Sequence, residues 1–242
     1  MICSNRHSFD IARSGYVNLL QPQDRRSKNP GDSADAVAAR RRFLDAGFAR
    51  TLLDAIASLV RTGPVLDAGC GEGYHLGAFS LEGYGIDISV PAINAAAKRY
   101  PDRHWVVANA DRFLPYAGSS FATITSITAR INPSEFRRVI RDDGKLLIAV
   151  AGADDLIELR EAVQGERKLI DRTQSAIAAL SELFALTGQS RAHHVAPLDA
   201  TAISDVMQSS YRGMRTRERE RLASLTALDV TLSRDLLLFA PR

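Results

Sequence analysis

The run of nine residues from Val65 to Gly73 carries the strongest chemical signal in the chain. It reads Val-Leu-Asp-Ala-Gly-Cys-Gly-Glu-Gly, so a short apolar segment runs into an acid and then into three glycines at alternate positions. Glycine allows a sharp backbone turn and leaves no Cβ in the way of a ligand. A helix that begins directly after such a turn directs its free N–H groups at the same ligand. The sequence therefore predicts a strand, a ligand-binding turn and a helix, with ligand contacts from Asp67, Gly69, Gly71, Glu72 and Gly73.

A second acid stands at a separation that suits a nucleoside ligand. Asp87 ends the segment Gly85-Ile86-Asp87 and lies about 20 residues after Asp67. The second strand of a βαβ unit presents a carboxylate to a ribose at about this distance. We predict that Asp87 accepts both ribose hydroxyls and that Ile88 lines the same site.

The spacing of the glycines selects among the ligands that use such a turn. A P-loop is excluded because no Lys-Ser/Thr pair follows the glycines. Dinucleotide-binding turns use Gly-x-Gly-x-x-Gly, whereas this turn reads Gly-x-Gly-x-Gly after an acid. That pattern is typical of Rossmann-like methyltransferases that use S-adenosyl-L-methionine, and a dinucleotide enzyme is the less favoured alternative.

Polar residues also follow the next two predicted strands. Asn109 and Asp111 stand where a doubly wound sheet places an adenine ring, and either side chain is a candidate to bind its exocyclic amine. A carboxylate that caps a turn is the alternative for Asp111. Arg130 and Asn132 follow the fourth strand on the side of the methyl acceptor, although Asn132 is equally suited to be a helix N-cap.

The elements that must hold these residues alternate between strand and helix. The fold class predicted is α/β, a Rossmann-like class I methyltransferase fold with a doubly wound, mostly parallel sheet and a small N-terminal appendage. Residues 1–33 form the appendage and residues 34–242 the Rossmann-like domain, with a helical insertion at about 155–190. The strands are expected at 65–68, 84–87, 105–108, 121–127 and 145–151, with a strand-like stretch at 192–196. The last stretch, 228–239, is expected to be a terminal strand that closes the sheet, and a hairpin is the alternative.

Composition limits the other possibilities. The chain has 242 residues, 45% of them hydrophobic, and its apolar runs fall far short of the roughly 20 residues that span a bilayer. Two cysteines, Cys3 and Cys70, give no disulfide framework, so a cytoplasmic protein is expected. The net charge is only +3, but residues 1–42 hold eight Lys or Arg against four Asp. This basic segment is suited to phosphates, and a solvated surface is the alternative.

The N-terminal segment gives a more specific indication than the glycine turn. Cys3-Ser4-Asn5-Arg6-His7 continues to Leu20, and with Gly31-Asp32-Ser33 and Phe43-Leu44-Asp45-Ala46-Gly47 it closely resembles the bacterial 23S ribosomal RNA guanine-N1 methyltransferases. That family includes housekeeping enzymes and relatives that give resistance to tylosin-type macrolides. The resemblance continues through the glycine turn and fades after about residue 160.

The resemblance implies methyl transfer to N1 of a guanine in a hairpin of 23S ribosomal RNA, which makes antibiotic resistance a possible phenotype. Guanine N1 carries a proton at neutral pH, so a base is required, and Asp111 is the candidate. The target base must leave its stack to be methylated. The resemblance also implies a possible homodimer. It further implies that the RNA phosphates are held by Arg25, Arg26, Lys28, Arg40 and Arg41.

This chain departs from the family pattern at several positions. The family begins with a zinc finger of Cys-x-x-Cys and a later Cys-x-x-x-His, of which only Cys3 and His7 are present. A structural zinc site needs four ligands, so two do not complete it and no metal is predicted. Either the Cys-x-x-Cys pair lies upstream of this sequence or the finger has been lost. Ala49 replaces a family tyrosine and Asp155 a family histidine, and both departures concern the cofactor pocket. Two alternatives follow, a methyltransferase for small molecules and a binding protein that keeps the fold without catalysis.

Overall fold

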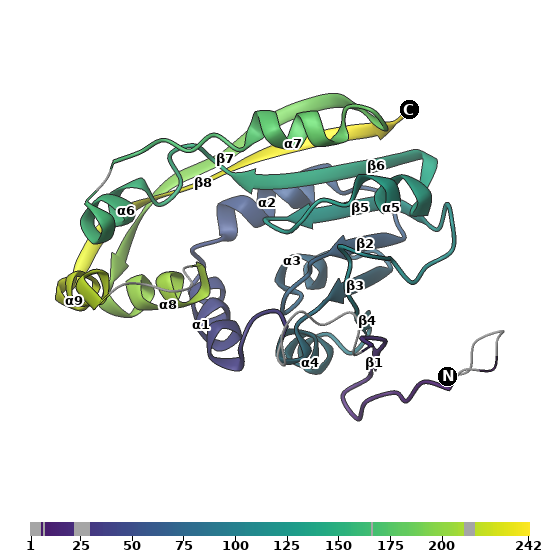
Figure 1. The fold of residues 1–242 in the computed structure, drawn as a ribbon, viewed down its shortest axis with the longest axis horizontal. Coiled ribbons are helices and arrows are strands. Elements are labelled where there is room, and N and C mark those ends of the chain that lie inside the picture. The colour runs from purple at the N-terminus through teal and green to yellow at the C-terminus, as the bar shows by residue number, and fades with distance from the viewer. Residues whose placement is uncertain (1–5, 7, 22–29, 166, 211–215) are drawn as a thin grey trace.

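The computed structural model describes residues 6, 8–21, 30–165, 167–210 and 216–242, which form one mixed β-sheet with helices on both faces (Figure 1). In chain order the strands are β1 (Tyr16–Asn18), β2 (Val65–Ala68), β3 (Gly83–Asp87), β4 (His104–Val107), β5 (Phe121–Ile127), β6 (Ile140–Ala151), β7 (Phe184–Asp199) and β8 (Ala227–Pro241). Their order across the sheet is β1-β4-β3-β2-β5-β6-β8-β7. The pairs from β1 to β6 are parallel, and β8 runs antiparallel to both β6 and β7. The chain reverses its direction of travel across the sheet at β2 and β5, which is where ligands bind in such sheets.

Alternate residues of the central strands face two separate cores. Leu146 and Ile148 of β6 pack in one core, whereas Leu147 and Ala149 pack in the other. All seven residues of β5 are buried, as its β-branched composition predicts for a strand covered on both faces. The sheet is therefore a rigid base for the loops that leave its carboxyl edge.

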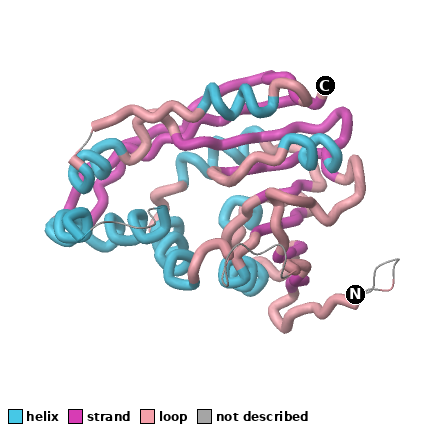
Figure 2. The backbone as a smooth tube through the Cα atoms, viewed as in Figure 1, coloured by secondary structure: helices cyan, strands magenta, loops and turns pink. Residues whose placement is uncertain are grey.

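Nine helices are found in the described residues: α1 (Ala34–Asp45), α2 (Arg50–Leu59), α3 (Tyr74–Gly77), α4 (Val90–Arg99), α5 (Pro133–Val139), α6 (Ile157–Gln164), α7 (Thr173–Leu180), α8 (Ala200–Ser210) and α9 (Thr216–Ser224). The first core contains residues of α5 and α7, and the second contains residues of α2, α3 and α4. A third core joins α1, α6 and α8 to one end of β7 and β8. Figures 1 and 2 show these helices gathered at the end of the long strands, away from the N-terminus.

Capping explains where the helices near the site begin. The Ser33 hydroxyl accepts a hydrogen bond from the N–H of Ala36 (3.2 Å) at the start of α1. The Ser89 hydroxyl accepts one from Ala92 (3.2 Å) at the start of α4. Both serines satisfy N–H groups that have no partner within the helix.

The structure differs from the sequence prediction in its outer parts. The segment predicted as an appendage contributes β1, which pairs in parallel with β4. The helical insertion predicted over 155–190 ends at Leu180, and Phe184 begins β7, a strand of 16 residues where only 192–196 was predicted. The terminal stretch is one strand, β8, as we favoured over a hairpin. No helix in the described part of the chain is long and apolar enough to cross a membrane.

Candidate cofactor and acceptor site

The glycine turn connects β2 to α3 at the carboxyl edge of the sheet. Its glycines all have positive φ angles, +82° at Gly69, +55° at Gly71 and +76° at Gly73. A Cβ on Gly69 would lie 2.4 Å from the Cβ of Ala129, and one on Gly73 would lie 2.4 Å from the ring of Trp105. Glycine is therefore required both by conformation and by the close approach of neighbouring loops.

Asp67 lies beneath this turn and is buried, with 1% of its surface exposed. Its Oδ1 accepts a hydrogen bond from the Thr125 hydroxyl of β5 at 2.8 Å. Burial raises the pKa of Asp67 to about 7, and the negative charge of Asp87 adds to the increase, while the hydrogen bond from Thr125 opposes it. Asp67 thus anchors the turn to the neighbouring strand.

Asp87 joins the turn to the end of β3. Its Oδ2 accepts a hydrogen bond from the N–H of Gly71 at 2.9 Å, and its Oδ1 accepts one from the N–H of Ser89 at 2.8 Å. Burial raises the pKa of this carboxyl, while the two N–H groups act in the opposite direction. An ionised carboxylate accepts about four hydrogen bonds, so each oxygen keeps capacity for one more donor. This is the capacity that the two hydroxyls of a ribose need.

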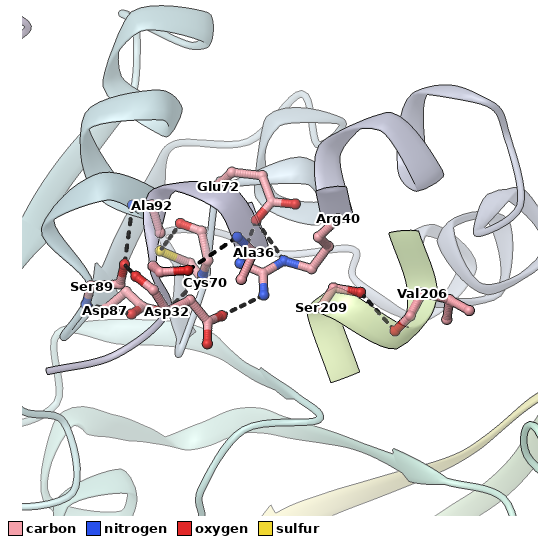
Figure 3. A network of polar contacts seen from close by, with 12 residues as sticks. Asp32, Ala36, Arg40, Cys70, Glu72, Asp87, Ser89, Ala92, Val206 and Ser209 are labelled. Atoms are coloured by element: carbon pink, nitrogen blue, oxygen red, sulfur yellow. Dashed lines mark hydrogen bonds and ion pairs between the residues drawn. The ribbon is translucent and has the colours of Figure 1, made fainter. Parts of the chain in front are cut away.

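An arginine from α1 lies over the glycine turn (Figure 3). The Arg40 Nε donates to the Glu72 Oε2 at 2.7 Å, and its Nη1 donates to the Asp32 Oδ2 at 2.5 Å. Its Nη2 lies 3.0 Å from the point that a Cβ on Gly71 would occupy. Although burial alone lowers the pKa of Arg40, Glu72 and Asp32 raise it above its ordinary value. The sequence grouped Arg40 with the phosphate contacts, whereas the structure turns its guanidinium toward the glycine turn.

The segment before α1 packs on the loop that follows β3. The Ser89 hydroxyl donates to the backbone carbonyl of Asp32 at 2.8 Å. Gly31 has a φ of +82°, and a Cβ there would lie 2.7 Å from the Ser89 Cβ. The segment of Gly31 and Asp32 is thereby fixed against the loop that follows Asp87.

The predicted adenine and acceptor residues meet at the loops after β4 and β5. The Asp111 Oδ2 lies 3.4 Å from the Arg130 Nε, and both side chains are exposed. Asn132 accepts from the N–H of Glu135 as the N-cap of α5, and its Nδ2 donates to the carbonyls of Ala110 and Asp111. The side chain of Asn132 thus fills the N-cap role. Asn109 accepts from the N–H of Asp111 at 3.1 Å and shapes the same loop.

A pocket that the sequence did not indicate lies between the α1–α2 connection and the strands β7 and β8. It is lined by Phe43, Phe48, Ala49, Leu52, Ala192, His194, Leu232, Ser233 and Arg234. Phe43 and Phe48 stack with ring centroids 4.8 Å apart. The pocket is therefore largely apolar and aromatic, with Arg234 as its positive group.

Arg234 connects this pocket to the cofactor side. It forms an ion pair with Asp155, whose Oδ1 also accepts from the N–H of Ser233 at 2.9 Å. His75, in α3 directly after the glycine turn, has a pKa lowered to about 4, first by burial and then by the charges of Arg234 and Arg40. His75 is therefore neutral at pH 7. Its buried Nε2 has no hydrogen-bond partner among the described residues.

Several predicted residues fall outside the part of the chain that the structure describes. These are Cys3 and His7 of the partial zinc motif and three of the predicted phosphate contacts, Arg25, Arg26 and Lys28. Arg41 is described and is about half exposed, 3.5 Å from Asp45. Among the described residues, no group of three His, Cys, Asp or Glu side chains is placed to hold a metal ion.

Comparison with known proteins agrees with the fold. A family model described as the N-terminal zinc ribbon of RlmA matches residues 1–28, and a methyltransferase domain model matches residues 65–147. Among solved structures, a protein from Bacillus halodurans superposes with a TM-score of 0.56 at 15% identity and covers 78% of this chain and 96% of its own. A SAM-dependent methyltransferase from Thermotoga maritima gives 0.53 at 13% identity, over 86% and 99% of the two chains. These two structures show the fold alone.

Sequence relatives show the family. A Streptomyces fradiae protein named 23S rRNA (guanine(748)-N(1))-methyltransferase is 34% identical over 96% of this chain and 87% of its own length. The Bacillus subtilis (strain 168) protein YxjB is 33% identical over 98% of this chain and 90% of its own. With the strand–turn–helix at Asp67 to Gly73 in place and the alignment running across nearly the whole chain, this protein belongs to the family of 23S rRNA (guanine-N1) methyltransferases.

Proposed function

We propose that this protein transfers a methyl group from S-adenosyl-L-methionine to N1 of a guanine in a hairpin of 23S ribosomal RNA. The observation that carries this proposal is the 34% identity to the Streptomyces fradiae enzyme over 96% of this chain. The methyl donor supplies an activated sulfonium methyl. The protein therefore has to align the nucleophile, exclude water and remove one proton.

The residues at the carboxyl edge fit this cofactor. The turn carries the backbone of Gly69 to Gly73 at the carboxyl edge of the sheet, between β2 and α3, which suits the methionine part of the cofactor. Asp87 keeps hydrogen-bonding capacity for the ribose hydroxyls. Ile88, which is half-buried beside it, and the loop of Asn109 and Asp111 line the side where the adenine would lie.

The aromatic pocket supports a guanine as the acceptor. Proteins hold bases that have left their stack against aromatic rings and read their edges by hydrogen bonds. The half-buried Phe48 offers such a ring, and the Arg234 guanidinium suits the O6 and N7 acceptors of guanine. Ala49 lines the same pocket, and its methyl side chain takes up little of it.

Asp111 stays the candidate base for the N1 proton. It is an exposed carboxylate on the cofactor edge, held 3.4 Å from Arg130. Arg130 and Arg41 have largely exposed side chains that suit phosphates, and we assign Arg25, Arg26 and Lys28 to the same role. A homodimer would extend this basic surface. The proposal assigns no role to Cys3 and His7, which lie outside the described residues.

Methylation of ribosomal RNA tests the proposal. Purified protein with radiolabelled S-adenosyl-L-methionine should label 23S RNA from a strain that lacks the family enzyme. Primer extension should then stop at one guanine, because a methyl on N1 blocks base pairing. Cofactor binding without RNA labelling would favour the small-molecule enzyme. An absence of cofactor binding by calorimetry would favour a non-catalytic protein.

A further inference from the structure

Two charged side chains beside the glycine turn each have a buried polar atom without a hydrogen bond. The Arg40 Nη2 is an ion-pair neighbour of the Glu72 Oε2 at 2.7 Å, yet it makes no hydrogen bond to any described residue. The Glu72 Oε1 accepts no hydrogen bond from them either. Buried polar atoms of charged groups are rarely left in this state, because the lost hydration is not replaced.

Their position points to the ligand of the turn. Glu72 belongs to the turn itself and has 3% of its surface exposed. The Arg40 guanidinium lies against Gly71, whose N–H donates to Asp87. The charge of Arg40 also acts on the carboxyl of Asp87. A donor and an acceptor of opposite charge therefore stand next to the predicted ribose site.

We propose that Arg40 and Glu72 together bind the amino-acid end of S-adenosyl-L-methionine, with Arg40 receiving the α-carboxylate and Glu72 the α-ammonium. This inference rests on the proposed function, since it assigns residues to the cofactor of that reaction. The methionine end is a zwitterion, with one carboxylate and one ammonium on the same carbon. It supplies an acceptor for the Nη2 donor and a donor for the Oε1 acceptor, so one group gives both atoms the hydrogen bond that they lack.

A role limited to holding α1 in place is less consistent with the geometry. Arg42, two residues further along α1, shows what such a role looks like. Its Nε and Nη2 both donate to Asp205 of α8, at 3.0 and 2.5 Å, so the carboxylate is engaged by two parallel bonds. Arg40 instead uses Nε and Nη1 for two different carboxylates and leaves Nη2 directed to the turn.

Cofactor analogues that lack one charged group provide the test. Isothermal titration calorimetry would compare S-adenosylhomocysteine with its decarboxylated analogue and its deaminated analogue, for the wild type and for Arg40→Gln and Glu72→Gln. We expect Arg40→Gln to weaken binding of S-adenosylhomocysteine and of the deaminated analogue about 10- to 100-fold, because a charge-assisted hydrogen bond is lost. Binding of the decarboxylated analogue should change less than about threefold. Glu72→Gln should weaken binding of S-adenosylhomocysteine and of the decarboxylated analogue, which keeps the ammonium. Binding of the deaminated analogue should change little.

Controls separate this effect from loss of folding. Arg42→Gln removes an arginine from the same helix and should leave all three affinities unchanged. Removing Arg40 leaves the buried Glu72 carboxylate without its partner, so the double variant Arg40→Gln/Glu72→Gln is included. Thermal unfolding confirms that each variant is folded before titration. In the double variant, removing either charged group from the ligand should no longer change its affinity.

The outcomes distinguish this inference from the proposed function. If wild-type protein does not bind S-adenosylhomocysteine, the proposed function fails. If the wild type binds but Arg40→Gln weakens all three ligands equally, or none of them, the assignment of Arg40 is wrong while the proposed function stands. An equal loss for both analogues in Glu72→Gln rejects the ammonium contact in the same way.

Discussion

Replacement of Asp67 by asparagine should change how the stability of this protein depends on pH. Asp67 is buried and has a pKa of about 7, against an ordinary value of 3.8. Asparagine has nearly the same shape, and its Oδ1 can still accept the Thr125 hydroxyl that now bonds at 2.8 Å. The substitution therefore removes the ionisation while it keeps the packing and the hydrogen bond.

The expected magnitude follows from proton linkage. Between pH 3.8 and 7 the native state holds a proton on Asp67 that the unfolded state has released. Stability from this group is thus fully present below pH 3.8 and is lost as pH rises to 7. The slope is about 1.4 kcal/mol per pH unit, so wild type should lose about 2 kcal/mol relative to Asp67→Asn between pH 5 and 7. The difference should then level off by about pH 8.

Urea unfolding measured at several pH values provides the assay. Trp105 is the single tryptophan and is 2% exposed, so its fluorescence reports loss of the core next to the turn. Titrating groups that do not interact with Asp67 contribute equally to both proteins and cancel in the difference. Thr125→Val, which removes a hydrogen bond that lowers the pKa of Asp67, should move the levelling point to higher pH. A difference between wild type and Asp67→Asn that is constant from pH 5 to 8 would refute the reasoning.

Three further predictions concern the cofactor, the acceptor and the turn. Asp87→Ala should weaken S-adenosylhomocysteine binding at least about 10-fold by calorimetry, because a charged acceptor is lost; unchanged affinity rejects the ribose assignment. Phe48→Ala should lower kcat/KM on 23S RNA about 10-fold through lost stacking, with cofactor affinity retained; a parallel loss of both places Phe48 at the cofactor instead. Gly73→Ala should lower the unfolding free energy by about 2–4 kcal/mol, because it combines a positive φ with overlap of Trp105. Gly15→Ala is the control in the same urea unfolding, because Gly15 also has a positive φ but no atom within 4 Å of an added Cβ. Its unfolding free energy should fall by about 1 kcal/mol. Equal decreases for the two variants would show that overlap with Trp105 contributes nothing.

The cofactor half of the site was predictable because its signal is local. Val65 to Gly73 is contiguous, and Asp87 stands at a separation set by one βαβ unit. Thr125 is different, since its importance depends on lying beside Asp67 in the register of β2 and β5. That neighbourhood exists only once the strand order is known. A threonine in a β-branched strand gives no sign of it in the sequence.

The basic N-terminal segment shows a related limit. Arg40 and Arg41 are adjacent and chemically alike, and both were assigned to phosphates. Successive residues of a helix point about 100° apart, so Arg41 stays exposed while Arg40 turns to Glu72, 32 residues further along the chain. The number of charged residues in the segment does not show which of the two arginines faces the turn. The orientation of α1, fixed by the packing of Gly31 on Ser89, decides which arginine meets the turn.

The two departures from the family pattern acquire a common explanation in the structure. In the sequence, Ala49 and Asp155 are separate changes that put the cofactor pocket in question. In the fold, Ala49 lines the aromatic pocket together with Arg234, and Asp155 forms the ion pair with that same arginine. Both changes therefore meet at Arg234, in the pocket that we propose for the acceptor, and neither residue takes part in the hydrogen bonds that Asp87 accepts. We infer that the two changes alter the surroundings of the receiving base and leave the glycine turn, which we assign to the cofactor, unaltered.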